Sequence, residues 1–190
     1  MKTLIFNGSP RKNGDTAKLL EKLCATLEGE VRIVRAYDCD ISPCVDCRYC
    51  WKHSGCAVND KMQEIYPYFE SCDNVVIASP IWFSSLSGPT LDITSRFQTY
   101  FAGRFFRKEQ QPVEKNGVLI FVGAQPGTEE APEKSALTIM RTMLVRRPMV
   151  ATVRCMNTDK IPAAEEQEAL AQVREAAEML NTLFKEKISG

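Results

Sequence analysis

The chain has 190 residues, which is most simply one domain (1–190) and is long enough to bury about 70% of its unfolded surface. It carries 24 Lys and Arg against 24 Asp and Glu, so no charge excess favours nucleic acid or a membrane surface as a partner. No apolar run approaches the roughly 20 residues of a membrane-spanning helix, and the first apolar run is too short for a signal peptide, so we expect a cytoplasmic protein.

The first predicted strand is Thr3–Phe6, an apolar run so short that it is typical of a strand buried on both faces of a parallel sheet. Pro10 and Gly14 interrupt the chain after it. An amphipathic pattern then begins at Thr16, with leucines spaced three and four residues apart, and predicts a helix. The chain therefore opens as strand, loop and helix.

The loop between this strand and helix has the chemistry of a phosphate site. Backbone N–H groups and the positive helix end attract an anion, and hydroxyl and guanidinium groups fix its oxygens. The motifs of P-loops and of dinucleotide sites are absent, and an ordinary polar loop capped by a threonine is the alternative. The predicted binding residues are Ser9, Arg11, Asn13, Gly14, Asp15 and Thr16.

Four further strands alternate with helices along the rest of the chain. The predicted strands are Val31–Arg35, Asn74–Ser79, Gly117–Gly123 and Met149–Cys155, and the predicted helices are Lys61–Ser71 (with a kink at Pro67), Pro89–Tyr100, Pro132–Arg146 and one that begins at Pro162. This alternation predicts an α/β fold: a doubly wound, flavodoxin-like, five-stranded parallel sheet in the order 2-1-3-4-5, with helices on both faces.

Ligands of such sheets bind beyond the carboxyl ends of the strands, and two more loops lie there. After the third strand, an aromatic segment is suited to a planar heterocycle, although its aromatic rings would equally pack in a core. After the fourth strand, the pair Pro126-Gly127 is typical of a turn. The predicted binding residues in these loops are Pro80, Ile81, Trp82, Phe83, Ser84, Ala124, Gln125 and Gly127.

A cysteine-rich insertion at about residues 38–60 holds five of the eight cysteines. In a reducing compartment, cysteines favour metal or redox use over a disulfide scaffold. Cys44, Cys47, Cys50 and Cys56 supply four thiolates within thirteen residues, which suits one soft metal centre. Their spacing differs from that of bacterial ferredoxins, zinc favours two separated ligand pairs, and a block without metal is the alternative.

The remaining candidates for metal ligands are weaker. Cys24, Cys72 and Cys155 lie on predicted apolar stripes or beside strands and are expected in the core. Cys39 is ambiguous. His53, the single histidine, is expected to be a solvated loop residue.

Three motifs resemble the flavodoxin-like NAD(P)H-dependent FMN reductases. The segment 8–16, GSPRKNGDT, resembles their phosphate loop, Gly-Ser-x-Arg-x-x-Gly-Asn-Thr, with Asp15 at the position of Asn. The segment 79–83, SPIWF, resembles Ser-Pro-x-Tyr/Trp-x, whereas the later Leu-Lys-x-Phe-x-Asp-Arg motif keeps only Arg96 of its charged positions. The cysteine block and the segment 59–62, NDKM, resemble those of the iron-sulfur flavoprotein branch.

The resemblance implies a flavoprotein that binds FMN, uses NAD(P)H as co-substrate and needs no catalytic residue, because the cofactor carries the chemistry. It implies a [4Fe-4S] cluster on the four cysteines of the block. The implied partners are a small-molecule electron donor or acceptor, with a ferredoxin as the protein alternative, and a second copy, as a homodimer or dimer of dimers, through Tyr100–Arg107. A quinone or nitro-compound reductase without a cluster, and a non-enzymatic electron carrier, stay open as alternatives.

Overall fold

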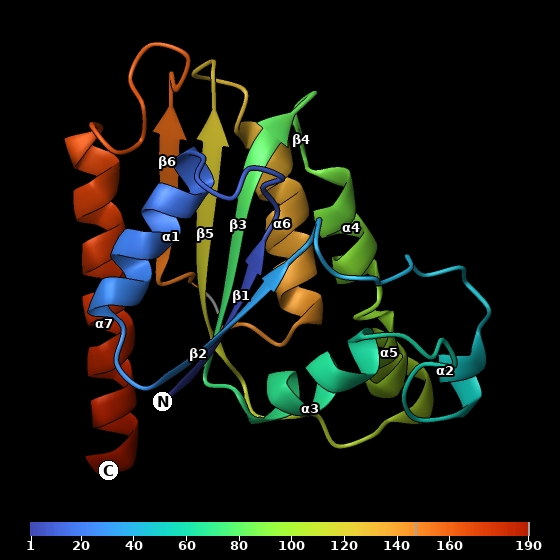
Figure 1. Cartoon of the computed structure of the whole chain (residues 1–190). Helices are drawn as coiled ribbons and strands as arrows, with labels where there is room; N and C mark the ends of the chain where they lie inside the picture. Colours follow the sequence, from blue (N-terminus) through green and yellow to red (C-terminus); the bar gives the residue numbers. More distant parts are fainter. Residues whose placement is uncertain (147, 190) are drawn as a thin grey trace.

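The computed structural model describes residues 1–146 and 148–189, which form a central sheet between two layers of helices (Figure 1). The parallel strands lie in the order β2-β1-β3-β5-β6. They are β1 (Lys2–Asn7), β2 (Glu30–Arg35), β3 (Asn74–Trp82), β5 (Asn116–Gly123) and β6 (Ala151–Met156). Numbered without the short β4, this is the predicted order 2-1-3-4-5, so the flavodoxin-like fold is confirmed.

The central strands are apolar along their whole length because both of their faces are covered. Leu4 of β1 is paired with Val75 of β3, and both face one core; the next pair, Ile5 and Val76, faces the other core. All four side chains are fully buried. The alternation of side chains along each strand thus builds two cores from one apolar run.

Each core is closed by helices that lie on its own face of the sheet (Figure 1). On one face are α1 (Asp15–Thr26) and α7 (Gln167–Ser189), which also pack against each other. On the other face are α3 (Met62–Ser71), α4 (Gly88–Ser95), α5 (Gln98–Ala102) and α6 (Glu130–Thr142). A π-helical turn, η1 (Gly103–Arg107), follows α5, and α2 (Tyr49–Lys52) is a single turn inside the cysteine-rich insertion.

The strand predicted to stop before Pro80 instead continues to Trp82. It then turns back through Phe83 and Ser84 into β4 (Ser85–Leu86), which pairs with it antiparallel and makes a sixth strand. The loop prediction for Pro80–Trp82 was wrong because Pro80 lies near the strand end, where β3 has passed the last partner residues of β1.

Two helix predictions also need correction. The single helix predicted for Pro89–Tyr100 is divided into α4 and α5 around Arg96, a buried residue that the helix pattern treats as exposed. The last helix begins at Gln167 and not at Pro162, because the N–H of Ala163 donates to Asp15 and the Glu166 carboxylate caps the helix by accepting from Ala169. Helix α3 is continuous through Pro67, where a kink was predicted.

Among the residues described, no helix combines the length and the apolar character that crossing a lipid bilayer requires.

Candidate functional site

The three loops predicted to bind a ligand meet at the carboxyl edge of the sheet, the upper edge in Figure 1. The strand register brings them there: Asn7 of β1 lies beside Ala78 of β3, and Pro80 of β3 lies beside Val122 of β5. Open parallel sheets bind ligands at this edge. The structure therefore brings the predicted loops together, and their contacts with a cofactor stay a prediction.

The loop after β1 leaves the N-terminus of α1 open. In the described chain no side chain caps this twelve-residue helix, whose N-cap is Gly14. The hydroxyl-bearing residues Ser9 and Thr16 are only 3% and 2% exposed. Free first-turn N–H groups, the positive helix end and two buried hydroxyls form a donor set that fits the phosphate of FMN.

Arg11 lies over this helix end and is held there by Asp15. The guanidinium Nη2 donates to Asp15 Oδ2 at 2.8 Å, and a side chain at Gly14 would come within 2.9 Å of Arg11 Nε. Asp15 Oδ1 accepts from the N–H of Ala163 at 3.0 Å, so both carboxylate oxygens are engaged. Asp15, which was predicted to bind the cofactor, thereby holds Arg11 in place, and its own contact with a cofactor stays a prediction. Asn13 is exposed at the mouth of the loop.

The predicted aromatic segment forms the tip of the β3–β4 hairpin. Pro80, Ile81 and Trp82 end β3, and Phe83 and Ser84 form a two-residue turn with φ values of 50° and 55°. Two successive residues with positive φ are typical of a type I′ turn, where glycine or asparagine is usual. The Phe83 side chain is fully exposed and Trp82 is partly exposed. The aromatic rings therefore do not close the core, which was the alternative to a binding role.

Tyr37 is a residue of this edge that the sequence analysis missed. Its ring meets that of Trp82 edge to face, with the centroids 6.2 Å apart. Burial raises the pKa of Tyr37. Tyr37 lies two residues after β2, at the carboxyl end of a parallel strand, and that position was the available sequence signal.

The third loop, after β5, is a turn open to solvent. Ala124, Gln125 and Gly127 are all exposed, and Gly127 has a φ of +88°, a conformation that favours glycine. The Thr128 hydroxyl closes the turn by donating to the carbonyl of Gln125 at 2.8 Å. Its backbone groups are therefore free to border a ligand at the sheet edge.

Three buried hydroxyls support the phosphate loop from below, and sequence analysis did not single them out. The N–H of Ser87 donates to Ser79 Oγ at 3.0 Å, and Ser87 Oγ lies 2.8 Å from Thr90 Oγ1. Gly8 packs directly on this cluster: a Cβ at that position would lie 2.1 Å from Thr90 Oγ1. Only a glycine fits between β1 and the hydroxyls.

We expect Gly8→Ala to lower the free energy of unfolding by about 1–3 kcal/mol, because the added methyl group overpacks a buried site. Urea denaturation measures the change. Gly88→Ala is the matched control, since a Cβ there meets no atom within 4 Å. Equal free energies of unfolding for the two variants would mean that the Ser79, Ser87 and Thr90 side chains move aside without loss of stability, and would contradict the prediction.

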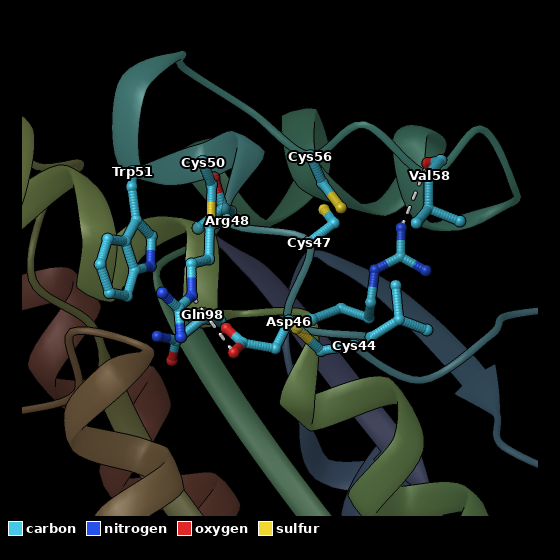
Figure 2. A pocket seen from close by; sticks show the side chains of 12 residues that line it. Cys44, Asp46, Cys47, Arg48, Cys50, Trp51, Cys56, Val58 and Gln98 are labelled. Atoms are coloured by element: carbon cyan, nitrogen blue, oxygen red, sulfur yellow. Dashed lines mark hydrogen bonds and ion pairs between the residues drawn. The ribbon is translucent and has the colours of Figure 1, made fainter.

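The four cysteines of the block line one pocket (Figure 2). Cys44 and Cys47 are exposed, whereas Cys50 and Cys56 are half-buried, and all four are free thiols. Burial raises the pKa of Cys50, and the neighbouring Cys44 and Cys56 raise it further. The structure therefore gathers the predicted metal ligands around a common space.

That space is small in this conformation. It has a volume of ≈ 20 Å³, enough for a water molecule. Over the part of the chain described, no three Cys, His, Asp or Glu side chains are arranged to hold a metal ion. The thiolate donor set fits an iron-sulfur centre chemically. A space of this size does not hold a group of several atoms, so binding one would require the pocket lining to rearrange.

The half-buried side of the pocket is anchored by side chains from the neighbouring helices. Gln63 Nε2 donates to the carbonyls of Cys56 at 3.0 Å and Val58 at 2.7 Å. Arg107 Nη1 donates to the carbonyl of Cys50. The exposed Cys44 is also held, because its backbone N–H donates to Ser95 Oγ of α4 at 2.9 Å. These bonds fix the backbone at Cys44, Cys50 and Cys56, and Cys47 lies on the exposed stretch between them.

The cysteine pocket lies away from the three ligand loops within one chain. In Figure 1 the insertion with α2 lies at the lower right, whereas the loops lie along the upper edge. Of the other cysteines, Cys72 and Cys155 are buried in the two cores, Cys24 packs against a core, and Cys39 packs beside the first core. His53 is exposed and stacks on Tyr49, so the expectation of a solvated loop residue is confirmed.

The comparison with protein families gives a match over most of the chain. A family model described as NADPH-dependent FMN reductase matches residues 1–154. An iron-sulfur flavoprotein of Clostridioides difficile is 33% identical over 110 residues, which are 55% of this chain and 49% of the relative. One of Archaeoglobus fulgidus is 31% identical over 126 residues, 62% of this chain and 60% of the relative. The chain thus spans about half the length of the curated relatives it matches.

The solved structures that resemble the chain share its fold at low sequence identity. An FMN-dependent NADH-azoreductase from Bacillus anthracis, in complex with FMN, has a TM-score of 0.65 and 16% identity, covering 95% of this chain and 100% of that one. An NADH:FMN oxidoreductase in its apo form has a TM-score of 0.62 and 19% identity, and the match covers 95% of this chain and 88% of that one. These likenesses confirm the flavodoxin-like arrangement of the sheet.

Proposed function

This chain belongs to the NADPH-dependent FMN reductase family, and from that premise we propose that it binds FMN and transfers electrons from NAD(P)H to a small-molecule acceptor. The observation that carries the proposal is the open N-terminus of α1, flanked by the buried hydroxyls of Ser9 and Thr16 and covered by Arg11. Among the residues that the structure describes, we identify one such phosphate site at the sheet edge, which favours FMN over a dinucleotide.

The proposed roles of the residues follow from their positions. The Ser9 and Thr16 hydroxyls and the first-turn N–H groups of α1 would bind the phosphate, with Arg11 held in place by Asp15. The exposed hairpin tip at Trp82 and the turn 124–127 would border the ring system. When bound, FMN supplies the redox chemistry, so the protein binds and orients and no acid or base is assigned.

Two alternatives are separated by the acceptor. A quinone or nitro-compound reductase would oxidise NADH or NADPH steadily with quinone, whereas an electron carrier would exchange electrons with reduced ferredoxin and show no turnover with a nicotinamide. We expect NAD(P)H oxidation that depends on added quinone. Exchange with ferredoxin in the absence of NAD(P)H turnover would replace the enzyme proposal with the carrier.

We also propose that Cys44, Cys47, Cys50 and Cys56 ligate a [4Fe-4S] cluster. The support is that four free thiols from one short segment line one pocket, and that thiolates are the ligands of such clusters. Hydrogen bonds anchor the backbone at Cys44, Cys50 and Cys56, so any adjustment around a larger group would centre on the exposed stretch with Cys47. The iron-sulfur flavoprotein relatives agree with this proposal in name.

A homodimer, or a dimer of dimers, is the proposed assembly. Phe101, Phe105 and Phe106 are 37%, 56% and 47% exposed, so these rings do not close the core of a single chain. They lie among arginines, and Phe106 stacks on Trp51 beside the cysteine pocket, with the ring centroids 4.5 Å apart. Exposed aromatic rings and arginines are enriched at protein interfaces.

We expect sedimentation at micromolar concentration to give a dimer or larger assembly, and Phe105→Asp to shift it toward monomer, because a charge replaces an interfacial ring. Ile188→Asp, an exposed apolar position on α7, is the control and should leave the assembly unchanged. A monomeric unaltered chain would contradict the proposal.

The proposed location is the cytoplasm, and the partners are small molecules or a redox protein. Eight cysteines, all free thiols in the structure, are in keeping with a reducing compartment. The balanced charge offers nothing that would recruit nucleic acid or an anionic membrane.

A further inference from the structure

Arg96, at the junction of α4 and α5, closes the base of the cysteine segment. It is 1% exposed. Nη1 donates to the carbonyl of Ser42 at 2.8 Å, before the first cysteine of the block, and Nη2 donates to the carbonyl of Val58 at 3.2 Å, after the last one. One side chain therefore ties together the two ends of the segment that carries all four thiols.

Asp60 completes this clamp. Its carboxylate accepts from both terminal nitrogens of Arg96, at 2.6 Å and 3.3 Å, and from the backbone N–H groups of Ser42 at 3.1 Å and Met62 at 2.9 Å. Partial burial acts to raise the pKa of Asp60, but these donors outweigh it and hold the pKa below its ordinary value. The carboxylate therefore stays charged opposite the guanidinium.

The same guanidinium also faces the thiols. Arg96 lines the cysteine pocket, and its Nε is buried without a hydrogen-bond partner among the described residues. Burial acts to lower the pKa of Arg96, but the Asp60 carboxylate, Tyr66 and the Cys56 thiol raise it overall. A buried, permanently charged donor therefore lies next to one thiol of the block with a hydrogen bond still to give.

We propose that Arg96 is the positioning residue of the cysteine pocket: it fixes both ends of the segment through Ser42, Val58 and Asp60, and it brings a positive charge to the wall of the pocket that the four thiols line. The inference rests on the proposed use of the four thiols as ligands. It goes further, because it assigns a role to Arg96, the charged residue of the Leu-Lys-x-Phe-x-Asp-Arg motif that this chain keeps.

The chemical consequence concerns both geometry and charge. Thiolates around one centre repel one another, and an inserted iron-sulfur group adds to the negative charge when it is reduced. A guanidinium at the wall of the pocket favours the reduced form, and hydrogen bonds and charge near the sulfurs are known to set the potentials of such centres. The clamp fixes the segment at Ser42 and Val58, and all four cysteines of the block lie between these two points.

Arg48 offers a matched control for the charge. It also lines the pocket, but it is exposed, and its ion pair with Asp46 at 3.5 Å and its cation–π contact with Trp51 at 4.8 Å both stay within the cysteine-rich insertion. The test compares Arg96→Lys with Arg48→Lys, since each keeps its charge and loses the forked geometry of a guanidinium. Only Arg96 uses the forked geometry to join Ser42, Val58 and Asp60, so only Arg96→Lys should loosen the segment.

The first readout needs no metal. With the reduced apoprotein, a maleimide probe labels each thiol, and mass spectrometry follows the rate at each site. We expect Arg96→Lys to raise the rate at Cys56 about tenfold or more, with little change at the already exposed Cys47, and Arg48→Lys to change neither. Equal rates at Cys56 in the two variants and the unaltered chain would overturn the proposal.

The second readout is the midpoint potential of the reconstituted iron-sulfur centre. We expect Arg96→Lys to lower it, by the equivalent of about tenfold weaker stabilisation of the reduced form, which is 59 mV for one electron. A potential equal to that of Arg48→Lys would contradict the role. If the unaltered chain binds no iron, the cluster proposal fails, and the labelling rates alone decide whether Arg96 positions the pocket.

Hydrogen exchange in the unaltered chain covers the case in which Arg96→Lys does not fold. The clamp predicts slow exchange at the amide of Ser42, which donates to Asp60, and fast exchange at the amide of Cys47 on the exposed tip. Similar fast exchange at both amides would mean that the base of the segment is not held, and would overturn the inference.

Discussion

Replacing Ser9 and Thr16 together by alanine is expected to weaken FMN binding by about 10²–10⁴-fold. Each hydroxyl would donate a hydrogen bond to a charged phosphate, worth about 1.5–3 kcal/mol, and every 1.4 kcal/mol is about tenfold in affinity. Both side chains are buried beside the open helix end, so water replaces them poorly. Titration of the apoprotein with FMN, followed by quenching of flavin fluorescence, measures the loss.

The control is the double variant Thr26→Ala and Ser71→Ala, which removes the same two kinds of hydroxyl. The Thr26 hydroxyl donates to the carbonyl of Lys22 within α1, and Ser71 lies at the end of α3, where its hydroxyl donates to the carbonyl of Tyr68. This variant should bind FMN as the unaltered chain does. Unchanged FMN affinity in the Ser9 and Thr16 variant would mean that these hydroxyls do not bind the phosphate, and would contradict the proposed site.

Cys50→Ser is expected to abolish iron binding. After anaerobic reconstitution, the unaltered chain should hold about four iron atoms and matching acid-labile sulfide, because one [4Fe-4S] cluster takes four thiolates. Cys50 is half-buried on α2 with its carbonyl held by Arg107, so its thiolate is a fixed ligand whose loss the exposed cysteines do not compensate. Iron and sulfide assays measure the result.

Cys39→Ser is the control, because Cys39 packs beside the core and does not line the pocket. It should keep the full iron content. Iron retained in Cys50→Ser would exclude that cysteine as a ligand. An unaltered chain that binds FMN and no iron would leave a flavin reductase with an empty cysteine block.

The fold was predictable because its strands are nearly pure apolar runs. Thr3–Phe6 and Gly117–Gly123 are buried on both faces, so each run had to belong to a covered parallel sheet, and the alternation with helices fixed the order. Short elements without such a pattern could not be predicted from the sequence. The two-stranded β3–β4 hairpin turns at Phe83 and Ser84, where no glycine or asparagine marks the positive φ values.

The candidate site was predictable where it is local in sequence and not where it depends on distant contacts. Ser9 and Thr16 lie in one loop, and the order of strand, loop and helix places them at a helix end. The bond between Asp15 and Ala163 could not be predicted, because the two residues are far apart in sequence. Tyr37 reaches the site only through its contact with Trp82.

Arg96 illustrates the same limit from inside a helix pattern. Periodicity treats an arginine as a surface residue, and the pattern around it predicts one continuous helix. Its burial depends on three acceptors that lie before and after the cysteine block, some 36 to 54 positions away along the chain. Such a network becomes visible only when the chain is folded.

We propose above that this chain is an FMN-dependent oxidoreductase that accepts electrons from NAD(P)H. The most direct test is to load the apoprotein with FMN, remove excess flavin, and add NADH or NADPH under anaerobic conditions while following the absorbance of the bound flavin. We predict one FMN per chain and bleaching of its visible absorbance by at least one of the two nucleotides. A chain that retains no FMN, or whose bound FMN neither nucleotide reduces, would contradict the claim.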